Sequence, residues 1–298
     1  GLVPGPPRLV GAAARGAPVT VLVTGAAGRL GRAVVAGFAE RRQVVALDRT
    51  ALDVTDRHAV HEAVRAHRPE VVVNCSAWTD VDGCESDPDR ARRTNAEAVG
   101  HLSEAADRVG AHLVHVSTDF VFDGRADTPY PEDHPTGPLS TYGATKLAGE
   151  EAAGPSATVM RTSWLQPADA PGMVERVLAD LAGDDPVLLS DQRRACPTFV
   201  ADLVPVLARL ADERVAGVVH ATNAGATSWF QFARHVATLA GQDPDRIAAC
   251  PDPGLDGSLP ARRPAYSALD NSVLRSLGHP GLRDHRDAVA EAVARAVG

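Results

Sequence analysis

A glycine-rich turn between a strand pattern and a helix pattern constrains this chain more than any other feature of its sequence. The segment Val19–Val23 is a run of β-branched and aliphatic residues, which predicts a strand buried on both faces. The following segment Thr24–Gly31 carries glycines with the spacing G-x-x-G-x-x-G, and a helix pattern continues from Arg29 to about Glu40. Glycines let the backbone approach a pyrophosphate, and free N–H groups at a helix N-terminus bind it. The turn therefore predicts a dinucleotide site, with a purely structural tight turn as the alternative.

Strand and helix patterns alternate through the first 160 residues. Short apolar runs predict further strands at 44–47, 71–73, 113–116 and 157–160. The clearest helix pattern runs from 91 to 109, where apolar residues recur every three or four positions, and Gly110 ends it. Another helix is expected to begin at the N-cap Asp56 and to end at His67, before Pro69. This alternation is typical of βαβ units and predicts a parallel sheet.

The second half of the chain has a looser pattern, with longer loops and more prolines. A strand at 217–222, a helix from Ser228 to Gly241 and a final helix at 284–297 are predicted. The predicted fold class is α/β, a Rossmann-type doubly wound parallel sheet with a smaller C-terminal substrate-binding lobe. We expect a disordered leader at 1–17 and a Rossmann dinucleotide-binding domain at 18–161. We expect residues 162–298 to form mainly the substrate-binding lobe, with 200–240 packing back onto the first domain.

Charge and composition exclude several classes of function. A formal net charge of −8 argues against a nucleic-acid partner, because phosphate binding needs a basic face. The sequence has no apolar run of the length that spans a bilayer, so a membrane is not an expected partner. The run His61-Glu62 with His67 lacks the spacing of a zinc site, and no metal is expected. Free thiols in a reducing cytoplasm are expected for the four cysteines, Cys75, Cys84, Cys196 and Cys250.

Residues after the second strand suit the adenosine half of a dinucleotide. Asp48 stands 23 positions after Gly25, where a carboxylate can bond the ribose hydroxyls. The adjacent Arg49 can instead pair with a 2′-phosphate, so NADPH is favoured and NADH stays open. Asp53 and Val54 are candidates for the adenine edge, with a simple turn aspartate as the alternative. The residues expected at the pyrophosphate are those of the glycine turn: Gly25, Gly28, Arg29, Leu30 and Gly31.

A Y-x-x-x-K motif and a strand-end hydroxyl supply the candidate catalytic groups. Tyr142 and Lys146 are four positions apart on a predicted helix, so both side chains lie on one face. A lysine cation beside the phenol, with the positive charge of an oxidised nicotinamide, is expected to lower the pKa of Tyr142. Tyr142 can then donate a proton to a carbonyl oxygen as a hydride reaches the carbon. Thr118 ends the fourth strand, where ligands bind, and its hydroxyl can hold the same oxygen; a turn cap is the alternative.

Longer segments resemble the extended short-chain dehydrogenase/reductase family and, within it, the dTDP-4-dehydrorhamnose reductases. The resemblance covers nearly all of the chain from Val19 to about Asn271. Its most specific parts are V-V-V-N at 71–74, T-D-V-D-G-C-E at 79–85, H-V-S-T-D-F-V-F-D-G at 115–124, P-L-S-T-Y-G-A-T-K-L-A-G-E at 138–150, R-T-S-W at 161–164, D-Q at 191–192, P-T at 197–198 and R-P-x-x-S at 263–267.

The resemblance implies reduction of the C4 ketone of a dTDP-4-keto-6-deoxyhexose in deoxysugar biosynthesis, with Thr118, Tyr142 and Lys146 as the catalytic triad. It implies that Ser76 and Ala77 contact the cofactor. Residues expected to face the sugar nucleotide are Asp119, Phe120, Trp164 and Arg263. Simple structural roles remain open for two of these, a core position for Trp164 and a surface ion pair for Arg263. A cytoplasmic enzyme is expected, with a homodimer as one option for its assembly.

Two departures from the family pattern leave the exact hexose open. Leu165-Gln166-Pro167 stands where V-Y-G is usual, and Asn74-Cys75-Ser76 stands where N-A-A is usual. One alternative function is a sugar-nucleotide epimerase or 4,6-dehydratase on the same fold. The segment Thr118-Asp119-Phe120 lacks the glutamate of the dehydratases, which argues against water elimination. The other alternative is a non-catalytic regulatory subunit that binds a dinucleotide.

Overall fold

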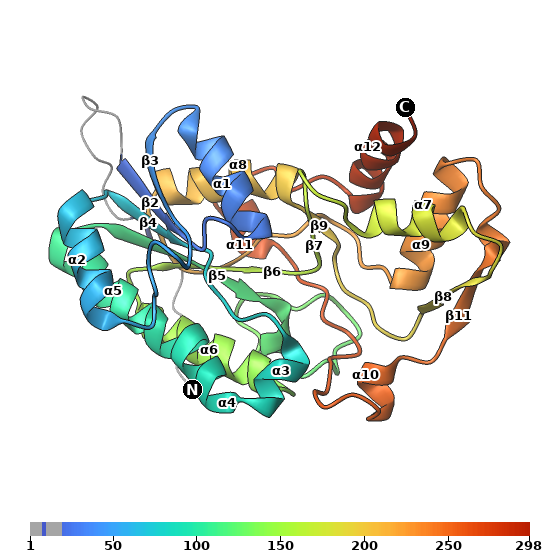
Figure 1. Ribbon diagram of the computed structural model, residues 1–298, viewed down its shortest axis with the longest axis horizontal. Coiled ribbons are helices and arrows are strands. Elements are labelled where there is room, and N and C mark those ends of the chain that lie inside the picture. The colour runs from blue at the N-terminus through green and yellow to red at the C-terminus, as the bar shows by residue number, and fades with distance from the viewer. Residues whose placement is uncertain (1–7, 10–19) are drawn as a thin grey trace.

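A parallel sheet organises the molecule (Figure 1). The computed structural model describes residues 8–9 and 20–298. Within this part of the chain the largest sheet has seven strands in the order β1-β10-β6-β5-β4-β2-β3. All neighbouring pairs are parallel except β1 with β10. The strands are β1 (Arg8–Leu9), β2 (Thr20–Thr24), β3 (Gln43–Leu47), β4 (Val71–Asn74), β5 (His112–Thr118), β6 (Thr158–Thr162) and β10 (Val215–His220).

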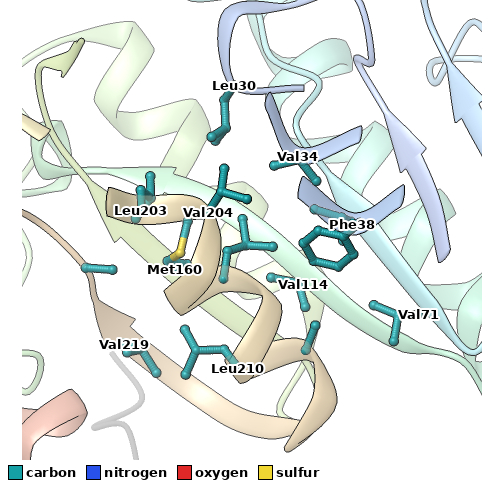
Figure 2. Packing of buried hydrophobic residues seen from close by; sticks show 14 of the residues in the cluster. Leu30, Val34, Phe38, Val71, Val114, Met160, Leu203, Val204, Leu210 and Val219 are labelled. Carbon is teal, nitrogen blue, oxygen red and sulfur yellow. The ribbon is translucent and has the colours of Figure 1, made fainter. Parts of the chain in front are cut away.

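One face of this sheet is covered by α1 (Arg29–Ala39), α8 (Val200–Asp212) and α11 (Ser272–Ser276). Figure 2 shows Phe38 and Val34 of α1 and Leu210 of α8 packed over strand residues. These side chains are buried because each helix turns its apolar stripe toward the valine-rich strands. Gly37 lets α1 and α8 approach closely, since a Cβ there would come within 2.6 Å of Val204.

The opposite face of the sheet is covered by α2 (Arg57–His67), α5 (Ala98–Val109) and α6 (Thr141–Ala153). A second apolar cluster, with Leu22, Val72 and Leu102 at its centre, joins these helices to the strands. The sheet is therefore the middle layer of a three-layer α/β/α sandwich, and the predicted fold class is confirmed. In such a sheet, ligands bind at the carboxyl ends of the strands, which here carry Thr24, Asn74 and Thr118.

A smaller lobe stands beside the carboxyl ends of the strands, at the right of Figure 1. Its helices share a third apolar cluster with one small sheet. They are α7 (Met173–Leu181), α9 (Trp229–Leu239) and α12 (His285–Val297), and the sheet pairs β8 (Val187–Ser190) with β11 (Ile247–Cys250). The short elements β7 (Leu165–Gln166), β9 (Thr198–Phe199), η3 (Pro244–Arg246) and α10 (Pro253–Asp256) connect these parts.

Most predicted elements agree with the structure to within two residues, but the helix expected at 91–109 is interrupted. The chain forms α3 (Val81–Ser86) and α4 (Pro88–Arg92), then a π-helical turn η1 (Arg93–Glu97) before α5. Inside this turn, the Asn95 side chain bonds both the N–H and the carbonyl of Trp78, at 2.8 and 3.1 Å. The π turn places Asn95 toward the loop after β4, and a 3.6-residue pattern does not reveal it.

Two segments near the expected lobe boundaries make contacts that the structure describes. Arg8–Leu9 lies inside the expected leader but pairs antiparallel with Val215 and Ala216; the rest of 1–17, like Val19, lies outside the described residues. Of the segment 200–240, α8 and β10 join the first lobe, whereas α9 belongs to the apolar cluster of the second. The difference arises because Ser228 starts a helix whose apolar face meets α7 and α12.

The structure also bears on the cysteines, on metal sites and on membrane-spanning helices. All four cysteines lie in the described part of the chain and are unpaired. Residues 8–9 and 20–298 contain no group of three or more His, Cys, Asp or Glu side chains that could hold a metal ion. In that same part of the chain, no helix is long and apolar enough to cross a bilayer.

Candidate active site

The glycine turn brings backbone against backbone at the carboxyl end of β2. Gly25 has a φ of +65°, and a Cβ there would come within 2.8 Å of the carbonyl carbon of Cys75. A Cβ on Gly31 would come within 2.1 Å of the Gly25 carbonyl oxygen. Gly28 is the N-cap of α1 and brings no side chain to the helix N-terminus. The N-terminus of α1 is therefore not covered by a capping side chain, as a pyrophosphate site requires.

A cavity of about 410 Å³ opens from this turn along the strand ends. Eight of the residues predicted to contact the cofactor line it: Gly25, Gly28, Asp48, Arg49, Asp53, Val54, Ser76 and Ala77. Arg29, Leu30 and Gly31 lie outside the lining; Leu30 is buried in the core because its position in α1 faces the sheet. The lining also contains residues that the sequence analysis did not single out: Ala27, Leu52, Thr55, Cys75, Trp78, Arg90, Arg93 and Thr94.

The two aspartates that line the cavity, Asp48 and Asp53, each stabilise the turn that follows them. Asp48 Oδ1 accepts hydrogen bonds from the N–H of Thr50 at 2.8 Å and of Ala51 at 3.0 Å, and from the Thr50 hydroxyl. Asp53 Oδ1 accepts from the N–H and the hydroxyl of Thr55. These hydrogen bonds lower the pKa of both carboxyls, led in each case by the threonine hydroxyl. Both aspartates therefore stay ionised, with Oδ1 engaged in the turn and Oδ2 left for a ligand.

Three arginines share the cavity wall. Arg49 follows Asp48, and the π turn adds Arg93, while Arg90 lies with its guanidinium 4.1 Å from the centre of the Trp78 ring. Guanidinium groups are the side chains best suited to a phosphate. The cavity wall suits a dinucleotide, because the uncapped N-terminus of α1 lies at one part of it and arginine guanidinium groups lie at another.

Tyr142 and Lys146 lie on α6 and are almost completely buried, with 8% and 2% of their surface exposed. Ser140 caps this helix by accepting a hydrogen bond from the N–H of Gly143. The ring of Phe120 meets Tyr142 edge to face, with centroids 5.5 Å apart. Tyr142 shares an apolar cluster with Trp78, and Trp78 lines the cavity. Tyr142 and Lys146 are therefore not part of the cavity lining, and Trp78 connects Tyr142 to it.

The environment of Tyr142 corrects one expectation. Burial raises the pKa of the Tyr142 phenol above its ordinary value, and the neighbouring Thr118 hydroxyl opposes this rise. Lys146 Nζ donates to the Val116 carbonyl at 2.7 Å and lies 3.2 Å from Nε2 of His115, so its contacts are with β5. The expectation that Lys146 lowers the pKa of Tyr142 is therefore wrong for the protein groups alone. Burial also lowers the pKa of Lys146, to about 8.

Thr118 and Asp119 occupy the end of β5, as predicted. The Thr118 hydroxyl donates to Asp119 Oδ1 at 3.1 Å, and the Ser267 hydroxyl donates to Oδ2 at 2.5 Å. Burial raises the pKa of Asp119 to about 6, while the bonds from Ser267 and Thr118 act in the opposite direction. A buried carboxyl of this kind can exchange a proton near neutral pH.

The two residues with open structural alternatives make well-defined protein contacts. Trp164 stacks on Trp229, with ring centroids 3.9 Å apart and planes 8° apart, and its φ of +41° is unusual for a residue other than glycine. Arg263 Nη2 pairs with Asp82 at 2.6 Å. The ion pair named as the alternative for Arg263 is thus present, and it links the second lobe to α3.

Comparison with known proteins matches the chain over residues 19–297 with the family described as RmlD substrate binding domain. The chain is 44% identical to a dTDP-4-dehydrorhamnose reductase of Streptomyces griseus over 281 residues, which are 91% of each chain. It belongs to this family. The predicted resemblance to the dTDP-4-dehydrorhamnose reductases is confirmed.

Two further family members are informative. A probable dTDP-4,6-dihydroxy-2-methyloxan-3-one 4-ketoreductase of Streptomyces antibioticus is also 44% identical, over 91% of this chain and 93% of that protein. The crystal structure of a dTDP-4-dehydrorhamnose reductase from Bacillus anthracis in complex with NADP superimposes with a TM-score of 0.87 at 29% identity. That match covers 94% of this chain and 100% of the other. The expected cofactor, NADPH, agrees with this relative.

Proposed function

We propose that this protein reduces the C4 ketone of a dTDP-4-keto-6-deoxyhexose with NADPH. The observation that supports the proposal is the packing of Tyr142 in one cluster with Trp78, which lines a glycine-cradled cavity, in a chain of the reductase family. NADPH supplies the hydride when it is bound. Fixing the ketone and delivering a proton to its oxygen then fall to the side chains of the protein.

Tyr142 is the proposed proton donor. Burial keeps its phenol protonated at neutral pH, which suits a group that must give a proton to the ketone oxygen. Thr118 lies next to the phenol, and its hydroxyl is proposed to hold the same oxygen by a hydrogen bond. Lys146, four residues along α6, is proposed to face the nicotinamide ribose and, in its charged form, to stabilise the phenolate that proton transfer leaves behind.

Four further residues are proposed to bind the sugar nucleotide. Asp119 follows Thr118, Phe120 packs on Tyr142, and Trp164 presents an indole that is part of a stacked pair. An indole face is suited to the apolar side of a pyranose ring. Arg263 is proposed to meet the diphosphate, which requires it to share or leave the carboxylate of Asp82.

The remaining proposed cofactor contacts are assigned according to the residues that line the cavity. Gly25 and Gly28 are proposed to meet the pyrophosphate, with Arg29, Leu30 and Gly31 shaping the turn behind them. Asp48, Asp53 and Val54 are proposed to meet the adenosine, Arg49 the 2′-phosphate, and Ser76 and Ala77 the nicotinamide half. A homodimer and a cytoplasmic location remain predictions from the sequence.

Turnover of a defined substrate tests the proposal. Purified protein, NADPH and chemically prepared dTDP-4-keto-6-deoxyhexose should give stoichiometric loss of nicotinamide absorbance and a dTDP-6-deoxyhexose with a C4 hydroxyl. Comparing a substrate that carries a 2-hydroxyl with its 2-deoxy counterpart distinguishes a rhamnose-type from an antibiotic-type pathway. Isomerised sugar without consumption of NADPH would show the epimerase alternative instead, and dinucleotide binding without turnover would show the regulatory one.

A further inference from the structure

A chain of buried polar side chains under α6 leads to Lys146, and its other three members have no part in the mechanism above. It runs from Thr24 at the end of β2 through Asn74 on β4 and His115 on β5 to Lys146 on α6. All four side chains have 2% or less of their surface exposed. Solvent therefore cannot satisfy any of these groups, and their hydrogen bonds must be satisfied among themselves and the nearby backbone.

The Asn74 amide sets the direction of this chain. Its Oδ1 atom accepts from the backbone N–H of Ser76 at 3.0 Å and from the Thr24 hydroxyl at 2.8 Å. A backbone N–H can only donate, so the amide cannot be turned around without placing two donors together. The Nδ2 group of Asn74 therefore faces Nδ1 of His115, at 3.1 Å, as a donor. Nδ1 must carry a lone pair, and a neutral His115 then carries its proton on Nε2.

The Nε2 proton points at Lys146. An ammonium group has three donors and no lone pair, so a charged Lys146 would place donor against donor across the 3.2 Å contact. An uncharged amine accepts from Nε2–H with its lone pair and still donates to the Val116 carbonyl. We infer that His115, held in one tautomer by Asn74, is a positioning residue that favours the uncharged amine of Lys146 and thereby sets the pH range in which this lysine carries its charge. The inference rests on the proposed role of Lys146 in the reduction.

Other ionisable groups near Lys146 do not reverse this preference. Glu150 on α6 and Cys75 after β4 both raise the pKa of Lys146, but burial outweighs them. The Glu150 carboxylate is already paired with Arg161 on β6 at 2.7 Å and accepts a hydrogen bond from Ser117. The other ionisable groups at this end of the site, Tyr142 and Asp119, are themselves held toward their neutral forms by burial.

An imidazolium at position 115 does not offer another solution. Burial holds the pKa of His115 well below its usual value, and the charge of Lys146 acts in the same direction. To carry a full charge, Lys146 must therefore make His115 move its proton from Nε2 to Nδ1, against the donor of Asn74. The two protonation events are coupled through one ring.

Lys146 is the only lysine in the 298 residues, which makes the inference directly measurable. Protein labelled with ¹³C at lysine Cε gives one side-chain signal, and its shift with pH reports the pKa of Lys146 without any turnover. We expect a midpoint well below that of an ordinary lysine in the wild type. In His115→Gln the amide oxygen can face the ammonium as an acceptor, and the midpoint should rise by about one pH unit, a tenfold change in the equilibrium.

His112→Gln is the matched control, because His112 is a buried histidine at the other end of β5 that bonds Thr158. This variant should leave the Lys146 midpoint unchanged. Asn74→Asp is the second test: a carboxylate at position 74 accepts from Nδ1–H, reverses the tautomer and should also raise the midpoint. It covers the case in which His115→Gln does not fold.

The two-bond ¹H–¹⁵N spectrum of histidine-labelled wild-type protein reports the tautomer of His115. The His115 signal is assigned as the one that His115→Gln removes or that Asn74→Asp shifts. A proton on Nε2 supports the inference, and a proton on Nδ1 or on both nitrogens overturns it. An unchanged Lys146 midpoint in both variants also overturns it. Failure of the protein to reduce a dTDP-4-keto-sugar would instead contradict the proposed function. It would not affect the measured Lys146 midpoint or the measured His115 tautomer.

Discussion

The hydroxyl of Ser267 donates a hydrogen bond to Oδ2 of Asp119, at 2.5 Å, and joins two segments 148 residues apart. Asp119 directly follows Thr118 at the end of β5, and Ser267 lies in the segment between α10 and α11. Both side chains are buried. The segment between α10 and α11 thus contacts the residue next to the proposed catalytic threonine through a single hydrogen-bond donor.

Burial of Asp119 makes the stability of the protein depend on pH, and the hydrogen bond from Ser267 acts in the opposite direction. Because the pKa of Asp119 is raised from 3.8 to about 6 in the folded protein, folding favours the neutral carboxyl. The free energy of unfolding therefore falls as the pH rises from 3.8 to about 6. A two-unit shift corresponds to about 2 to 3 kcal/mol. Asp119→Asn should therefore be more stable relative to wild type at pH 7.5 than at pH 4, as measured by urea unfolding. An equal difference at both pH values would contradict the raised pKa, and lowered kcat/KM for the sugar is expected in the same variant.

The glycine turn predicts a sharp contrast between two helical glycines. Gly31→Ala drives a methyl group to within 2.1 Å of the Gly25 carbonyl, so the turn must open. We expect a loss of about 2 kcal/mol or more in the free energy of unfolding and at least about tenfold weaker binding of NADP⁺. Calorimetric titration with NADP⁺ measures the second effect.

Gly100→Ala is the control for this change, since a Cβ at Gly100 in α5 would lie 3.8 Å from Ala152, at ordinary contact distance. It should stabilise the protein by about 0.5 to 1 kcal/mol and leave NADP⁺ binding unaltered. If the two variants behave alike, the close approach at Gly31 has no part in cofactor binding.

Arg49 should decide between the two nicotinamide cofactors. Its loss removes a charged partner for the 2′-phosphate, so Arg49→Ala should raise KM for NADPH by about tenfold to a hundredfold and leave KM for NADH nearly constant. Steady-state kinetics with both cofactors measures the ratio. Arg65→Ala, which removes an exposed arginine of α2 paired with Glu62, is the control. A parallel rise of both KM values would refute a 2′-phosphate contact.

The buried ion pair of Arg161 and Glu150 predicts that one substitution changes both the stability of the protein and the pKa of Lys146. Glu150→Gln leaves the Arg161 guanidinium, 3% exposed, without its carboxylate, and should lower the free energy of unfolding by about 3 to 5 kcal/mol. Because Glu150 raises the pKa of Lys146, its removal should also lower the midpoint of the single lysine signal. A midpoint that stays constant would show that Arg161 already screens this carboxylate completely.

Local patterns along the chain were sufficient to predict the fold and to place Tyr142 and Lys146 on one helix. The glycine turn follows β2 directly, and Tyr142 and Lys146 share a helix, so spacing alone places each set. The strands read as continuous valine runs because both faces are buried.

Features that depend on contacts between distant segments could not be predicted in this way. The π turn at Asn95 is set by a side chain that bonds Trp78, 17 residues earlier. Arg93, which lines the cavity, is the first residue of that turn. The stack of Trp164 on Trp229 and the contact of His115 with Lys146 join residues 65 and 31 positions apart, and nothing in either local pattern marks them.

The central claim is that the Tyr142 phenol gives its proton to the ketone oxygen. Single-turnover oxidation of bound NADPH by dTDP-4-keto-6-deoxyhexose in Tyr142→Phe tests it most directly, with NADPH affinity measured in parallel by fluorescence. We predict a rate lower by about 10² to 10⁴ with unchanged NADPH affinity. A variant that binds NADPH normally and oxidises it at the wild-type rate would contradict the claim.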